Sequence, residues 1–203
     1  VSFTGSTRAG ILISKAAADT VKTVSLELGG KSPNLVFDDT DIEAAVARGA
    51  SFCFANTGQS CNAAPRMLVE RSAYDKAVEV AAATATATRI DMPSKHGDHI
   101  GPVVSEAQFD KVQTLIQAGI DENARLVAGG VGRPEGLNRG WFVKPTVFAD
   151  ATPDMTIMRE EIFGPVFSII EAKDNNHAID LANNSKYGLG AAVFTSNINN
   201  GRK

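Results

Sequence analysis

Short apolar runs rich in β-branched residues alternate with longer segments of helical periodicity along almost the whole chain. The runs of strand character are residues 1–3, 23–28, 32–39, 66–70, 124–130, 141–150, 165–172 and 189–196. The segments of helical character are residues 6–19, 41–56, 72–87, 106–122 and 175–184. Parallel strands need crossover connections, and these are usually helices. The alternation therefore predicts an α/β fold with a mostly parallel sheet flanked by helices.

Composition excludes several classes of function. The chain has 203 residues, 43% of them hydrophobic and 21% charged, as in an ordinary globular domain. A net charge of −3 gives no electrostatic basis for a nucleic-acid partner. No apolar run is long enough to cross a membrane. Two cysteines do not make a disulfide framework, so we expect a reducing compartment, the cytoplasm.

The two cysteines occupy different local settings. Cys53 lies within a helical pattern between two phenylalanines, where a small buried side chain is expected. Cys61 follows Gly58 and Gln59, where that pattern ends, and its small neighbours leave room for a substrate. A thiol nucleophile needs such access, and its own backbone N–H can stabilise an oxyanion. The cysteine spacing matches no zinc signature, so we expect no metal.

Glu27 interrupts the apolar run Thr23–Leu28, where we expect a buried strand. A charge in that position is costly unless it is paired. Two interpretations are open. Glu27 is either a buried carboxylate satisfied by backbone N–H groups or a desolvated general base.

Five segments together resemble the aldehyde dehydrogenase superfamily. "LELGGKSPN" (26–34) and "GQSC" (58–61) resemble its two active-site signatures, and their spacing agrees with that family. "FTGST" (3–7), "EEIFGPV" (160–166) and "YGLGAAVFT" (187–195) also match, in family order. The resemblance covers essentially the whole chain.

The resemblance implies that Cys61 attacks an aldehyde to give a thiohemiacetal, which transfers a hydride to NAD or NADP. Glu27 would activate the water that hydrolyses the resulting thioester to a carboxylic acid. The same resemblance implies six cofactor-binding residues: Gly5, Ser6, Leu28, Gln108, Glu161 and Phe163. In this assignment Glu161 holds ribose hydroxyls and Phe163 backs the nicotinamide, with Gln108 as a further ribose contact. Without the resemblance, Phe163 would be read as core and Glu161 as part of an exposed acidic pair.

The resemblance also implies how the chain is divided. Residues 1–28 correspond to the C-terminal remnant of a dinucleotide-binding domain. Residues 29–203 correspond to the catalytic, thiol-bearing domain, truncated at its C-terminal end. Because the chain opens at Val1 within a strand pattern, we expect a piece of a longer polypeptide. The resemblance implies that the parent protein is a homo-oligomer. We expect the piece alone to be inactive, or to keep only a residual thiol esterase activity.

Two classes of function compete with a dehydrogenase. One is a non-catalytic relative that keeps the fold, against which the presence of both Cys61 and Glu27 argues. The other is an esterase-like hydrolase that uses Cys61 alone. Two basic residues near the motifs have structural interpretations. We expect Lys31 to shape the turn after the glycines and Arg66 to form a structural ion pair.

Overall fold

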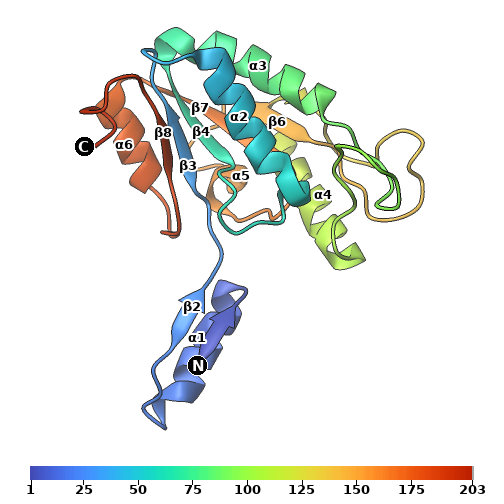
Figure 1. Ribbon diagram of the computed structural model, residues 1–203, viewed down its shortest axis with the longest axis vertical. Helices are drawn as coiled ribbons and strands as arrows, with labels where there is room; N and C mark the ends of the chain where they lie inside the picture. Colours follow the sequence, from blue (N-terminus) through green and yellow to red (C-terminus); the bar gives the residue numbers. More distant parts are fainter. Residues whose placement is uncertain (203) are drawn as a thin grey trace.

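A six-stranded sheet forms the centre of the protein, as the computed structural model describes it for residues 1–202 (Figure 1). Its strand order is β5-β6-β7-β4-β3-β8, and every neighbouring pair is parallel except β5 and β6. The strands are β3 (Pro33–Val36), β4 (Arg66–Glu70), β5 (Arg125–Ala128), β6 (Thr146–Ala149), β7 (Val166–Ala172) and β8 (Ala192–Phe194). The predicted α/β fold with a mostly parallel sheet is confirmed.

Helices cover both faces of this sheet and divide the core in two (Figure 1). One face packs on α2 (Ile42–Phe54) and α3 (Tyr74–Ala87), and the other on α4 (Glu106–Asp121), α5 (Thr156–Arg159) and α6 (Asn175–Asn183). Side chains alternate between the faces along each strand. In β4, Leu68 belongs to the α4 side while Met67 and Val69 belong to the α2 side.

The first 28 residues form a separate small unit of β1 (Ser2–Thr4), α1 (Thr7–Ala18) and β2 (Ser25–Glu27). Its two strands pair in parallel, with Phe3 opposite Leu26. In Figure 1 this unit projects from the main body and joins it through the chain just before β3. The predicted buried strand at 23–28 is wrong in one respect. With two strands and one helix, the unit leaves Ser25 and Glu27 exposed.

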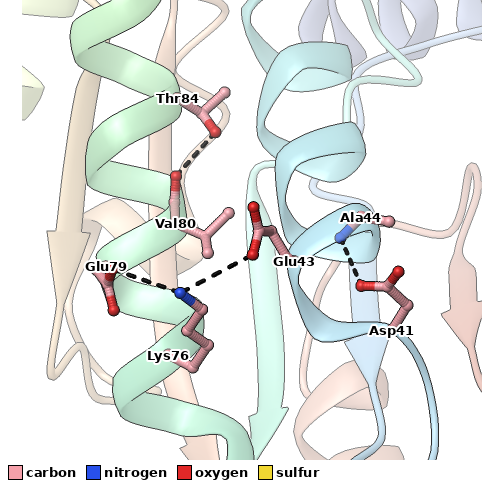
Figure 2. A network of polar contacts seen from close by, with 7 residues as sticks. All are labelled: Asp41, Glu43, Ala44, Lys76, Glu79, Val80 and Thr84. Atoms are coloured by element: carbon pink, nitrogen blue, oxygen red, sulfur yellow. Dashed lines mark hydrogen bonds and ion pairs between the residues drawn. The ribbon is translucent and has the colours of Figure 1, made fainter.

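Side-chain caps satisfy backbone N–H groups at the start of two helices. Ser6 caps α1 by accepting from the Ala9 N–H, and Asp41 caps α2 by accepting from the Ala44 N–H at 3.0 Å. Figure 2 shows α2 and α3 side by side, with Lys76 of α3 within 4.0 Å of Glu43 and 3.4 Å of Glu79. Such exposed pairs contribute little stability. The buried apolar faces of α2 and α3 hold these helices to the sheet.

Candidate active site

One cavity of about 540 Å³ brings together all eight residues that the sequence singled out: Gly5, Ser6, Glu27, Leu28, Cys61, Gln108, Glu161 and Phe163. They come from five places: the β1–α1 turn, the end of β2 and the residue after it, the turn before β4, the first turn of α4, and the loop before β7. These segments are far apart in the sequence. The cavity therefore lies where the small N-terminal unit meets the main body.

Cys61 lies on a tight turn at the wall of this cavity. The turn is closed by a hydrogen bond from the Ala63 N–H to the Ser60 carbonyl (3.1 Å), which places Cys61 in a central turn position. The residue is half-buried, so its thiol has partial access to solvent. Cys53 is 1% exposed, and its S–H donates to the Val166 carbonyl. Burial raises the pKa of the Cys53 thiol to about 12, so that this thiol remains protonated.

Two glycines after β2 allow the thiol turn and the loop before β7 each to approach this segment of the backbone. A Cβ at Gly30 would overlap the carbonyl oxygen of Cys61, and a Cβ at Gly29 would overlap the carboxylate of Glu161. The Gly30 N–H donates to Glu161 Oε1 at 2.9 Å. Here the absence of a side chain is required by close approach of neighbouring groups. The two motif glycines therefore leave room for the Cys61 carbonyl and for the Glu161 carboxylate.

Glu27 lies at the end of β2 and lines the same cavity. Its backbone carbonyl accepts from the Gly5 N–H (3.0 Å), which joins the β1–α1 turn to this point. Its side chain is exposed rather than buried. The argument from desolvation therefore does not apply to Glu27 in this chain, although Glu27 and Cys61 line the same cavity.

Gln108, in the first turn of α4, holds the loop that carries Phe163. Its side-chain amide donates to the carbonyls of Ile162 (3.0 Å) and Phe163 (2.8 Å). Phe163 has a φ of 58°, which is an outlier for a bulky residue. Lys111 also lines the cavity, although it lies outside every motif of the sequence named above. Its spacing of three residues from Gln108 on one helix is the signal that could have revealed it.

Arg66 makes no ion pair in the described part of the chain, so that prediction was wrong. Its guanidinium instead donates to the carbonyls of Lys31 (2.8 Å), Leu181 (3.1 Å) and Ala182 (2.9 Å). Arginine carries five donors in a rigid fork, which suits it to gathering several acceptors. It ties the start of β4 to α6 and to the segment before β3.

Lys31 is more deeply buried than the predicted role in a turn requires. It is 1% exposed, and its Nζ has no hydrogen-bond partner. Desolvation lowers the pKa of Lys31 to about 7, against weaker effects of nearby acidic groups that raise it. Nothing in the sequence around Lys31 indicates that this lysine, which precedes the buried strand β3, is itself buried without a partner.

Residues 1–202 contain no cluster of His, Cys, Asp and Glu side chains arranged to hold a metal ion. None of the helices in this range has the length and apolar character needed to cross a membrane.

The fold and the cavity define an α/β protein with an accessible thiol on a tight turn and a carboxylate on the same cavity wall. A profile described as the aldehyde dehydrogenase family matches residues 1–203. The chain belongs to the aldehyde dehydrogenase family.

Relatives of known sequence and structure agree with this assignment. The chain is 48% identical over 202 residues to a 3-succinoylsemialdehyde-pyridine dehydrogenase from a Pseudomonas species, covering 100% of this chain and 42% of that protein. A crystal structure of an aldehyde dehydrogenase from Bartonella henselae superposes with a TM-score of 0.97 at 53% identity, covering 99% of this chain and 42% of the other. A mutant aldehyde dehydrogenase from Pseudomonas syringae, in complex with NAD+ and octanal, gives a TM-score of 0.97 at 45% identity, over 99% and 41% of the two chains. The chain thus spans about two fifths of the length of the relatives it matches.

Proposed function

We propose that this chain supplies the nucleophile and the general base of an NAD(P)-dependent oxidation of an aldehyde to a carboxylic acid. The observation that carries the proposal is the single cavity lined by Cys61, Glu27 and the six candidate cofactor residues. Relatives crystallised with NAD+ support the cofactor class. The presence of Glu27 favours water over another acceptor of the acyl group.

The proposed reaction begins at the Cys61 sulfur. The thiolate adds to the aldehyde carbon, and the carbonyl oxygen becomes an oxyanion that the Cys61 N–H can stabilise. A bound nicotinamide nucleotide would supply the hydride acceptor that oxidises the aldehyde, and Cys61 would then carry the product as a thioester. Glu27 then takes a proton from a water molecule, which attacks the thioester and releases the carboxylic acid and the Cys61 thiolate, and Glu27 passes its proton to solvent.

The residues present fit a nicotinamide nucleotide on chemical grounds. The carboxylate of Glu161 is an acceptor suited to ribose hydroxyls, and Phe163 offers a ring on the same wall. The bond from Gly30 to Glu161 orients this carboxylate. Gly5 keeps the β1–α1 turn free of a side chain, so that a ligand can approach the backbone.

We extend the proposal to the organisation of the chain. Residues 1–28 are the end of a dinucleotide-binding domain and residues 29–203 the thiol-bearing domain, which is supported by the separate two-stranded sheet. The two unpaired cysteines support a reducing compartment, the cytoplasm. Homo-oligomerisation remains a prediction from the resemblance.

Two substitutions in the full-length enzyme test the proposed roles. Cys61→Ser should abolish NADH production from an aldehyde. Glu27→Gln should keep the first burst of NADH but slow steady-state turnover on the order of 10²–10⁴-fold, because only hydrolysis needs the base. Glu135→Gln, in an exposed glycine-rich loop, is the matched control and should behave as wild type. Unchanged turnover in Glu27→Gln would refute its role as base, and NADH production by Cys61→Ser would refute the nucleophile.

A further inference from the structure

Three consecutive residues before the thiol turn have left-handed backbone conformations. The φ angles of Asn56, Thr57 and Gly58 are 51°, 56° and 70°. For a β-branched residue such as Thr57 this conformation is an outlier that costs on the order of 1–3 kcal/mol. Surrounding contacts must therefore hold the turn in place.

Two side chains of this turn bind the same neighbouring segment, residues 101–104. The Thr57 hydroxyl donates to the Gly101 carbonyl at 3.0 Å. Gln59 Oε1 accepts from the Val104 N–H at 2.8 Å. These are bonds between segments more than 40 residues apart, and they lie directly before Cys61.

Residues 101–104 lead into α4, and α4 binds a second loop with a left-handed residue, the loop before β7 that carries Phe163. Gln108 donates to the carbonyls of Ile162 and Phe163, and Phe163 is itself left-handed. The two strained loops also meet directly, because a Cβ at Gly58 would overlap the backbone of Gly164. Residues 101–108 thus fasten both the thiol turn and the Phe163 loop.

We propose that Gln59 and Thr57 are positioning residues that fix the Cys61 thiol relative to the Phe163 loop. The proposal rests on the proposed function, in which Cys61 attacks the aldehyde and Phe163 backs the nicotinamide that takes its hydride. Without these two bonds, the strained turn would relax toward ordinary backbone angles and carry Cys61 with it. A displacement of about 1 Å at a reacting atom can cost on the order of 100-fold in rate.

The first experiment measures alkylation of Cys61 by iodoacetamide with peptide mapping, at a temperature well below unfolding. Gln59→Met removes the acceptor at similar size, and Thr57→Val removes the hydroxyl at similar shape. Each should raise the Cys61 alkylation rate by about threefold or more, because access governs the reaction of a thiol. Thr57→Ser keeps the hydroxyl and should restore the wild-type rate. Gln117→Met, an exposed position on α4, is the matched control.

The second experiment measures kcat and KM in the full-length enzyme. Gln59→Met and Thr57→Val should lower kcat about 10- to 100-fold with little change in the KM for NAD(P), since the cofactor contacts remain. A residue that only stabilises the fold would lower the unfolding midpoint without this split. Equal alkylation rates and equal kcat in all variants would overturn the proposal.

The alkylation experiment needs neither aldehyde nor cofactor, so it separates the two proposals. A wild-type Cys61 that resists alkylation would count against the proposed nucleophile. Faster alkylation in Gln59→Met would even then support the positioning role. If Gln59→Met does not fold, the pair Thr57→Val and Thr57→Ser decides the question through the loss and recovery of the hydroxyl.

Discussion

Replacing Lys31 by methionine should make the protein more stable near neutral pH, and the gain should shrink as the pH rises. Lys31 is fully buried and its Nζ has no partner. Desolvation lowers the pKa of Lys31 from the ordinary 10.5 to about 7. Between these values the unfolded chain binds a proton that the folded chain does not. The free energy of unfolding of the wild type therefore rises with pH in this range.

The size of the effect follows from this shift. One proton changes the free energy of unfolding by about 1.4 kcal/mol per pH unit where only the unfolded state binds it. Between about pH 7.5 and about pH 9, the difference between Lys31→Met and wild type should fall by about 2 kcal/mol. Packing differences between lysine and methionine do not depend on pH, so they cancel in this comparison. Burial raises the pKa of the Cys53 thiol to about 12, against a weaker effect of Lys31 that lowers it. Cys53 therefore adds an opposite trend above the ordinary thiol pKa, and the two proteins share this trend apart from the weaker effect of Lys31.

Urea unfolding followed by the fluorescence of Trp141, the single tryptophan, measures the effect at both pH values. Lys76→Met is the control, because this lysine lies on the exposed side of α3 (Figure 2). The difference in free energy of unfolding between Lys76→Met and wild type should stay constant across this pH range. A constant difference for Lys31→Met as well would show that Lys31 remains charged in the folded protein, and the argument from desolvation would be wrong.

Two further substitutions test the packing around the cavity. Gly58→Ala should lower the free energy of unfolding by about 1–3 kcal/mol more than Gly136→Ala. Both glycines have positive φ, but only Gly58 lies against another backbone segment, that of Gly164. Equal losses for the two variants in urea unfolding would contradict an overlap between a Cβ at position 58 and that backbone. Arg66→Lys should cost about 2–4 kcal/mol in the same assay, because one ammonium group cannot replace three guanidinium bonds to carbonyls; a cost below about 1 kcal/mol would show that these bonds add little.

The periodicity of the sequence predicted most of the fold. Strand β4 was predicted with its observed bounds, and α4 to within one residue. Such segments succeed because a buried strand or an amphipathic helix is recorded in consecutive residues. The predicted strand at 141–150 is shorter, with only Thr146–Ala149 in the sheet. The first residues of this predicted strand are apolar because Phe142 and Val143 are buried in the protein without pairing in the sheet.

Burial of single polar residues was predicted least well. Glu27 has apolar neighbours in sequence, yet it is exposed because its small unit offers nothing to cover it. Lys31 and Arg66 have the opposite outcome, since helices and loops from distant parts of the chain enclose them. Burial of a side chain depends on contacts across the fold, so local pattern alone does not determine it.

The gathering of the site residues depends on glycines more than on the functional side chains. Gly30 lies against the Cys61 carbonyl, Gly58 against the backbone of Gly164, and Gly164 against Val112 of α4. The first two contacts let two backbone segments approach to a distance that any side chain would prevent, and the third lets the Gly164 backbone lie directly on the Val112 side chain. The motif "LELGGKSPN" therefore contains both the candidate base, Glu27, and the glycine, Gly30, that leaves room for the thiol turn. This explains why motif residues separated by more than 100 positions line one cavity.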